Sequence, residues 1–237
     1  MRPKFWLGLL LTVVVFSILI NLGLWQLSRG HEKVLLEQSL SEREFSANIE
    51  LAELDVNQYR YLTGLRATAE LEPIPGKYLL LDNQTYQGKV GYLALQLMRI
   101  DSEQSVLFEV GFVEAEKQRN QLPNVIWLDK PERYEVRVYR RSANPLSNEL
   151  HLEAGKVGRI QNLNITELEA VWQQSIAPYV VQPQLEDWRY PQPWQPIPLS
   201  SEKHYGYALQ WFSMALALLL LSCWVLWRAL RKGDSNE

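Results

Sequence analysis

The sequence predicts a membrane protein of the α+β class, in which two transmembrane helices flank a β-rich periplasmic domain that holds one or two short helices. One observation is an uncharged, mostly apolar run near each end, residues 5–28 and 204–227, each 24 residues long. A helix crosses the hydrocarbon core of a bilayer with about 20 residues. The other is the middle section, 29–203, where short aliphatic and tyrosine-rich runs alternate with polar residues as half-buried strands do.

The first apolar run is predicted to be a retained anchor rather than a cleaved signal peptide. Arg2 and Lys4 would suit the basic start of a signal peptide. However, the apolar stretch is long, and the residues at its end, NLGLWQLSRG, do not contain the pattern of small residues at which signal peptides are cleaved.

Basic residues flank the two runs on their outer sides. The tails, 1–4 and 228–237, contain five of the 24 basic residues and two of the 27 acidic residues. Because cytoplasmic flanks of membrane helices are rich in Lys and Arg, both tails are expected in the cytoplasm. Residues 29–203 are then expected in the periplasm, and the chain is expected in the bacterial inner (plasma) membrane, in contact with lipid.

The middle section is acidic, with 25 Asp or Glu and 19 Lys or Arg in residues 29–203. This charge disfavours nucleic acid as a partner, because a negative domain is repelled by phosphates. The one cysteine, Cys223, lies in the second apolar run and is predicted to be a small packing residue. No disulfide is therefore expected in the middle section.

Alternating and continuous apolar runs predict the strands. Residues 59–71 alternate in places, and 76–100 reads as a hairpin whose loop extends from Asp82 to Gly88. In this interpretation Asp82 and Asn83 are turn residues. Further strands are expected at 105–114, 133–141, 156–161 and 178–183.

Two helices are expected outside the apolar runs. Residues 29–46 continue the first run as a polar helix. In 164–175, either Asn164 or Thr166 is a suitable cap. The apolar side of that helix is expected to consist of Ile165, Leu168, Val171 and Trp172. Residues 183–198 hold five prolines, which predicts an extended arm leading back to the membrane.

No motif in the sequence indicates an enzyme. The P-loop, dinucleotide-binding and nucleophile-elbow patterns are absent. The three histidines are not within one helical turn of one another, so a zinc or copper site with three or four N or S ligands is not expected.

Unusual residues concentrate where the two runs reach the outer membrane surface. On the first run, Gly23 permits close approach of another helix, and Gln26 and Arg29 share one helical face. Deeper in the two runs, the amides of Asn21 and Gln210 are expected to hydrogen-bond across the helix pair.

The second run begins with KHYGYALQWF, which places one histidine among aromatic rings. His204, Ala208 and Trp211 fall at i, i+4 and i+7 and form one stripe, with Tyr207 beside it. One interpretation is an ordinary interfacial belt. The other is a haem site, with His204 as axial ligand, Ala208 leaving space, the rings facing the macrocycle, and Arg29 pairing with an anionic group.

Three motifs, GLWQLSR…K (23–33), YLLLDNQTYQGKVGY (78–92) and HYGYALQWF (204–212), resemble those of the Surfeit locus protein 1 family of cytochrome c oxidase assembly factors. The resemblance extends over nearly the whole chain. The matching positions are Gly23, Trp25, Gln26, Arg29, Lys33, Asp82, Asn83, Gly88, Gly91, Tyr92, His204, Tyr207, Ala208, Trp211 and Phe212.

The resemblance implies an assembly factor that binds haem a and assists its insertion into subunit I of cytochrome c oxidase, with haem a synthase as a further partner. The implied site consists of His204 as axial ligand to the iron, Tyr207 and Trp211 beside the macrocycle, and Arg29 on a propionate. The alternative is a membrane scaffold without cofactor that stabilises subunit I. A copper carrier is a weaker third reading.

One stretch departs from the family pattern, which usually reads VLVNRGWVP in the middle strand. This chain has VLFEVGFVE, so Val110 and Phe112 stand where arginine and tryptophan are expected, and Glu114 replaces proline.

Overall fold

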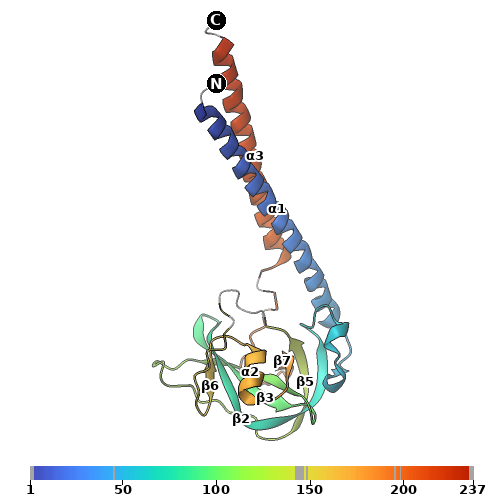
Figure 1. Ribbon diagram of the computed structural model, residues 1–237. Coiled ribbons are helices and arrows are strands. Elements are labelled where there is room, and N and C mark those ends of the chain that lie inside the picture. Colours follow the sequence, from blue (N-terminus) through green and yellow to red (C-terminus); the bar gives the residue numbers. More distant parts are fainter. Residues whose placement is uncertain are drawn as a thin grey trace. The chain divides into compact units, whose positions relative to one another are not determined.

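The computed structural model describes residues 3–44, 46–141, 147, 149–194, 196–197 and 199–234 (Figure 1). The chain divides into two compact units. The helix pair comprises residues 1–38 and 197–237, and the sheet unit comprises residues 39–196. Each unit is described by itself.

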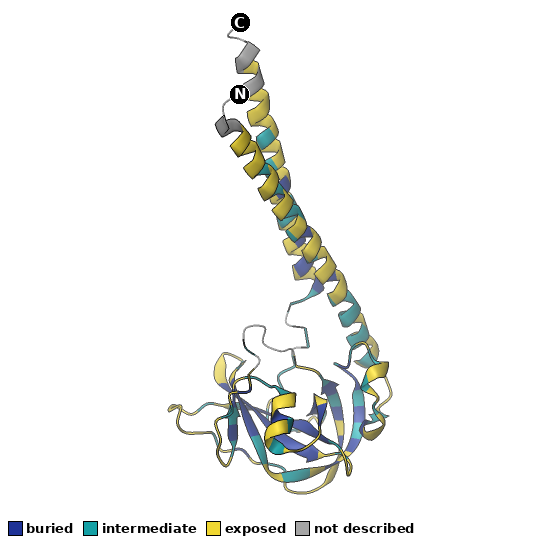
Figure 2. Cartoon of the chain, viewed as in Figure 1, coloured by how far each residue is buried: buried dark blue, intermediate teal, exposed yellow. Residues whose placement is uncertain are grey.

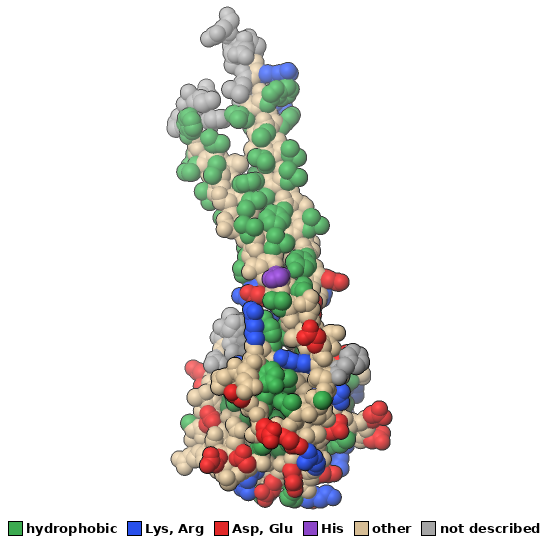
Figure 3. Space-filling view, turned by 90° about the vertical axis from the view of Figure 1, so that its right-hand side faces the viewer, with side chains coloured by type: hydrophobic (Ala, Val, Ile, Leu, Met, Phe, Trp, Pro, Cys, Tyr) green, Lys and Arg blue, Asp and Glu red, His purple; other side chains and the backbone are tan. Residues whose placement is uncertain are grey.

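The helix pair contains α3 (Ser201–Asp234) and the part of α1 (Pro3–Glu44) up to residue 38, and the two helices lie side by side (Figure 1). Both helices are long and apolar enough to cross a membrane. On the face shown in Figure 3, hydrophobic side chains cover most of the pair. These side chains are exposed to the surroundings, as they would be to lipid (Figure 2). The two predicted spans are confirmed as helices, and the expected polar helix after residue 28 is the uninterrupted continuation of α1.

In the residues that the structure describes, the sheet unit is built on seven strands. They are β1 (Ile49–Glu50), β2 (Arg66–Tyr86), β3 (Lys89–Arg99), β4 (Ser105–Glu114), β5 (Glu132–Tyr139), β6 (Gly158–Ile160) and β7 (Ile176–Pro183). The path β2–β3–β4–β7–β5 returns to β2, so these five strands form a closed ring. The short strands β1 and β6 pair in parallel with β2.

The two faces of the strands are both buried. One apolar cluster takes residues from all five strands of the ring, including Phe108, Tyr134 and Tyr179. The other lies beneath α2 (Ile165–Trp172), with Leu168 fully buried in it. Burial on both faces explains why β3 and β4 are almost continuously apolar rather than alternating.

The hairpin in 76–100 is confirmed, but its turn is shorter than expected. Only Gln87 and Gly88 lie between β2 and β3, both with positive φ (48° and 79°), as a tight hairpin turn requires. Asp82 and Asn83 lie within β2 instead, where the register with β3 shifts. The expectation that they are turn residues is therefore wrong, because a β-bulge and a turn use the same residue types.

Two further expectations need correction. Residues 59–65 are not a strand: they follow two short 3₁₀ helices, Leu51–Glu53 and Val56–Gln58, and bend at Gly64 (φ 93°). Cys223 is exposed on α3 and does not pack inside the helix pair.

The helix and the arm that follow in the sequence match their predictions in type. Asn164 is the cap of α2, because its side chain accepts a hydrogen bond from Glu167 N at 3.2 Å. Val171 is 53% exposed, so it does not belong to the buried side of α2 as expected. In the described part of 184–197 the chain forms neither helix nor strand, which agrees with the predicted arm.

Candidate functional site

Small, polar and aromatic side chains form the contact between α1 and α3. We call these residues the seam. On α1 they recur at intervals of three, four and seven positions, and on α3 at intervals of three or four apart from one adjacent pair, which is the spacing of side chains that face a partner helix. The seam consists of Gly23, Gln26, Gly30 and Glu37 on α1 and of Ser201, His204, Tyr205, Ala208 and Phe212 on α3.

The two glycines let aromatic rings of α3 approach the backbone of α1. A Cβ atom on Gly23 would lie 2.5 Å from the Phe212 ring, and one on Gly30 would lie 2.6 Å from the Tyr205 ring. Both distances are far below van der Waals contact. By contrast, a Cβ on Gly8, in the same helix, would meet nothing within 4 Å. The close approach is therefore present at the end of the pair that contains His204 and Gln26, and absent at Gly8.

His204 lies in this close contact and is only 8% exposed. Its Nδ1 is 2.7 Å from Oε1 of Gln26 on the facing helix. Since a carbonyl oxygen only accepts, the Nδ1–H of the imidazole donates this bond. The bond joins residues 178 positions apart, and it fixes the ring plane of His204 relative to α1.

The hydrogen bond also determines which ring nitrogen is free. With the proton on Nδ1, neutral imidazole carries its lone pair on Nε2. Within the described residues, two fully buried side-chain polar atoms have no hydrogen-bond partner, Arg137 Nε and Gln192 Oε1. Nε2 of His204 is not one of them, so this nitrogen is not fully buried in the protein. His204 thus offers an acceptor nitrogen, Nε2, on a ring that a carbonyl holds from its other side, as the rings of histidine ligands of metals usually are held.

The other predicted site residues surround His204 less closely. Trp211 is half-buried, and Tyr207 is 44% exposed outside the seam. Arg29 donates to Glu32 at 2.7 Å, with both side chains about half exposed. No hydrogen bond, ion pair or ring contact joins Arg29, Tyr207 or Trp211 to His204 in the part of the chain that the structure describes.

The expected amide pair between the helices is not formed. Asn21 Nδ2 donates to Ser17 O in its own helix at 2.7 Å, and Gln210 is exposed. An amide five residues further along α1, that of Gln26, bridges to α3 instead. A polar residue in a transmembrane helix can satisfy itself on the preceding turn, so composition alone does not show which amide crosses.

The second motif of the sequence lies in the sheet unit and has a structural role there. Asp82 is buried, accepts a hydrogen bond from Asn83 N at 2.7 Å and pairs with Arg119 at 3.0 Å. Asn83 has a positive φ of 59°. The motif therefore shapes the bulge of β2 and fixes the long connection after β4.

The positions that depart from the family pattern also have clear environments. Val110 and Phe112 are buried at 1% and 5% exposure, and Glu114 pairs with Lys89 at 2.6 Å. The apolar residues thus fit the core of this chain, and the glutamate joins the two strands of a hairpin.

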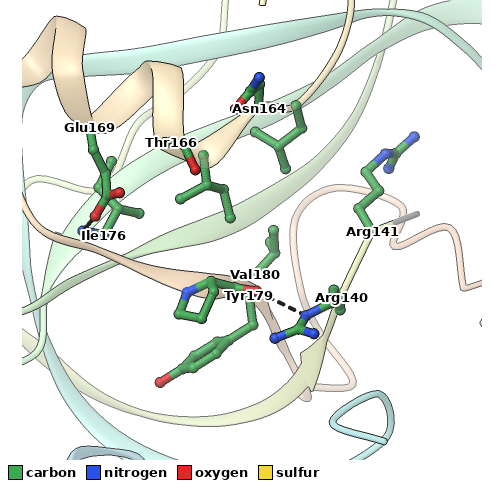
Figure 4. A pocket seen from close by; sticks show the side chains of 11 residues that line it. Arg140, Arg141, Asn164, Thr166, Glu169, Ile176, Tyr179 and Val180 are labelled. Atoms are coloured by element: carbon green, nitrogen blue, oxygen red, sulfur yellow. Dashed lines mark hydrogen bonds between the residues drawn. The ribbon is translucent and has the colours of Figure 1, made fainter. Parts of the chain in front are cut away.

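A cavity of about 220 Å³ lies between α2 and the end of β5 (Figure 4). Two arginines line it, but Figure 4 shows that their side chains point in different directions. Arg140 Nε donates to Pro178 O at 3.3 Å, and Arg141 donates to Gln84 Oε1. Because the guanidinium groups do not converge, this cavity does not form an anion site.

No group of three His, Cys, Asp or Glu side chains that could hold a metal ion occurs among the described residues. A haem iron can be held by one protein ligand, so the absence of such a group argues only against metal sites that need three or more protein ligands.

Comparison with known proteins identifies the family of the chain. No curated protein matches the chain. The model of the SURF1 family matches residues 13–216, which include most of α1, the whole sheet unit and the seam portion of α3. The SURF1 family is known for cytochrome c oxidase assembly and is not known as an enzyme family. The chain therefore belongs to the SURF1 family.

Proposed function

We propose that this protein binds haem a through His204 and assists its insertion into subunit I during assembly of cytochrome c oxidase. The observation that carries the proposal is the 2.7 Å hydrogen bond between His204 Nδ1 and Gln26 Oε1. It leaves Nε2 as the nitrogen able to bind a metal. Such an outer hydrogen bond orients a histidine ligand and raises its basicity.

The other predicted site residues, Tyr207, Trp211 and Arg29, are exposed enough to contact a bound haem. Tyr207 and Trp211 offer ring faces beside His204 on α3, to which the flat macrocycle can stack. Arg29 would take a propionate in place of Glu32. An exposed ion pair contributes about 0–1 kcal/mol, so exchanging Glu32 for another carboxylate costs little. When bound, haem a would supply an iron able to take a nitrogen ligand, and His204 would hold it through Nε2.

The place of the site on the helix pair fits a transient role. The seam belongs to helices suited to the membrane, where an apolar cofactor and a membrane-embedded partner are both accessible. Subunit I is the proposed recipient and haem a synthase a further partner. The basic flanks favour cytoplasmic ends, with the sheet unit in the periplasm.

A second candidate function is a scaffold without cofactor, which holds subunit I while it folds. The observation that favours it is the 8% exposure of His204. A hydrogen bond between helices stabilises their association in a membrane whether or not a ligand binds. In that case His204 and Gln26 serve the packing of the seam alone.

A visible absorption spectrum separates the two. The full chain is purified in mild detergent from cells that make haem a, beside His204→Ala and His31→Ala. His31 is exposed on the same helix pair and is the matched control. A haem a band in the wild type and in His31→Ala, but not in His204→Ala, supports the haem site. Colourless protein that copurifies with subunit I would favour the scaffold.

A further inference from the structure

A cavity of about 460 Å³ opens on the sheet unit, and none of the residues proposed above for the haem site lines it. One wall is the segment 126–130, between β4 and β5, and the other is part of the proline-rich arm, 187–190. Val110 and Tyr134, both at least 98% buried, also line it. Val110 lies where the register between β3 and β4 shifts, so a bulge shapes this side of the cavity.

Both walls are held in place by hydrogen bonds. The buried amide of Gln96 on β3 accepts from Leu128 N at 2.9 Å and donates to Leu128 O at 2.8 Å. Trp188 Nε1 donates to Val110 O at 2.7 Å, which attaches the arm to β4. Ile126 N donates to the hydroxyl of Tyr190 at 2.8 Å and joins one wall to the other. The cavity is therefore present before any ligand binds, which lowers the cost of binding.

Aromatic rings supply much of the lining. Trp188 lies edge-on to Tyr134, with ring centroids 6.2 Å apart, and Trp127 is stacked on Tyr78 at 4.7 Å. These contacts orient the indoles. The faces of tryptophan rings attract the cationic groups of arginine and lysine. Ile126, which is 58% exposed, adds an apolar surface at the same cavity.

Charged side chains with few partners complete the lining. Within the described residues, the carboxylates of Asp129 and Asp187 make no hydrogen bond or ion pair, and Glu132 accepts only from Tyr134 at 3.2 Å. Lys130 and Arg189 belong to the same lining and are also unpaired there. Three carboxylates against two cations leave the cavity negative.

Two of these carboxylates, Glu132 and Asp129, act on the buried phenol of Tyr134. Burial raises the pKa of Tyr134, and the charges of Glu132 and Asp129 raise this pKa further. The negative charges of Glu132 and Asp129 therefore act on a side chain that lines the cavity.

We propose that this cavity docks a basic segment of a partner polypeptide, with an arginine or lysine side chain between the tryptophan faces and the carboxylates. The sheet unit as a whole carries 22 acidic and 16 basic side chains, so its charge attracts the same partner from a distance. A bare metal ion fits less well, because Lys130 and Arg189 stand in the same lining. Nucleic acid is disfavoured by the charge.

A peptide titration followed by NMR tests the proposal. The full chain, with ¹⁵N-labelled tryptophan and without haem, is held in detergent micelles, and the indole N–H signals are recorded. The probes are a blocked Gly-Lys-Gly-Arg-Gly-Arg-Gly peptide and the same peptide with Glu at the three charged positions. Trp188→Phe and Trp127→Phe assign the two indole signals. We expect both signals to shift saturably with the basic peptide and to stay in place with the acidic one.

A charge-matched comparison then locates the binding. Asp129→Asn with Asp187→Asn should weaken binding of the basic peptide by about tenfold. Glu70→Gln with Glu103→Gln, which removes two exposed carboxylates outside the cavity, should leave it within about twofold. Equal weakening in both double variants, or unmoved signals of Trp188 and Trp127, overturns the proposal. Because haem is absent throughout, the result is independent of the proposed haem site.

Discussion

Glu37 of α1 caps the first turn of α3: its carboxylate accepts one hydrogen bond from the backbone N–H of Ser201 at 2.9 Å and another from the Ser201 hydroxyl at 2.6 Å. The first N–H groups of a helix lack partners in the helix itself, and a negative charge is favourable there. Usually a residue next to the helix in sequence supplies this cap. Here it comes from 164 positions away and joins the two helices beside His204.

Loss of this cap should loosen the first turn of α3. Glu37→Gln removes the charge and one of the two strong acceptors, which costs about 1–2 kcal/mol. We expect hydrogen–deuterium exchange in the first turn of α3 to rise about tenfold. Glu202→Gln, at an exposed carboxylate in the same turn, is the control and should change exchange much less. Equal rates in both variants would show that the contact does not hold α3.

Replacing a seam glycine by alanine should destabilise the helix pair, because the added methyl group would meet a ring of the other helix. Gly23→Ala forces the Phe212 ring aside, and overpacking of this kind costs about 1–3 kcal/mol. We expect a lower midpoint of thermal unfolding by circular dichroism. Gly8→Ala, where the new methyl group meets nothing, should be neutral or stabilising. Adding Phe212→Ala to Gly23→Ala should recover part of the loss, and no recovery would argue against this contact.

The elements of the fold were largely predictable, because each depends on local pattern. Long uncharged runs predict α1 and α3, and alternating or continuous apolar runs predict β4, β5 and β7. The exact turn of the hairpin was not predictable. Asp82 and Asn83 have turn chemistry, but their side chains shape a bulge and pair with Arg119, a residue 37 positions away.

The candidate site was predictable only in part, for the same reason. The spacing of His204 and Ala208 indicates one helical face, and both are buried on it. Nothing local indicates that Gln26 rather than Asn21 bridges to α3, or that Glu37 caps it. Those choices depend on how two helices with about 160 to 180 intervening residues meet.

A buried carboxyl in the sheet unit should make its stability depend on pH. Glu109 on β4 accepts hydrogen bonds from Tyr139 and from Gln182 Nε2, and Gln182 in turn accepts from Arg137. Burial raises the pKa of Glu109 above 4.5, although both neighbours and the charges of Arg141 and Arg137 oppose the rise.

A raised pKa means that the folded chain binds this proton more tightly than the unfolded chain does. The resulting stability is full below pH 4.5 and is lost as pH rises through the raised pKa. We therefore expect the free energy of unfolding, from urea titrations followed by tryptophan fluorescence, to decline toward neutral pH less steeply in Glu109→Gln than in the wild type. Exposed Glu103→Gln is the control. Identical slopes in all three proteins would exclude Glu109 as the cause.

The basic flanks predict that both chain ends lie in the cytoplasm. Green fluorescent protein fused after Glu237 should fluoresce, and alkaline phosphatase fused after Pro196 should be active, because these reporters function on opposite sides of the membrane. Replacing Arg228 and Arg231 by Gln should reduce fluorescence of the first fusion by weakening the charge signal. An active phosphatase at residue 237 would reverse the assignment for α3.

Gln26 should matter to haem retention through His204 rather than by direct contact. In Gln26→Leu the Nδ1–H of His204 loses its acceptor, so neither the ring plane nor the free nitrogen is fixed. Loss of such an outer hydrogen bond weakens metal binding by about 10- to 100-fold. We expect a matching fall in haem a retained, with a shifted Soret band. Gln26→Glu, which keeps an acceptor, should retain more haem than Gln26→Leu, and Gln210→Leu, at an exposed amide of α3, should behave as wild type. If Gln26→Leu keeps its haem while His204→Ala loses it, Gln26 only packs the seam.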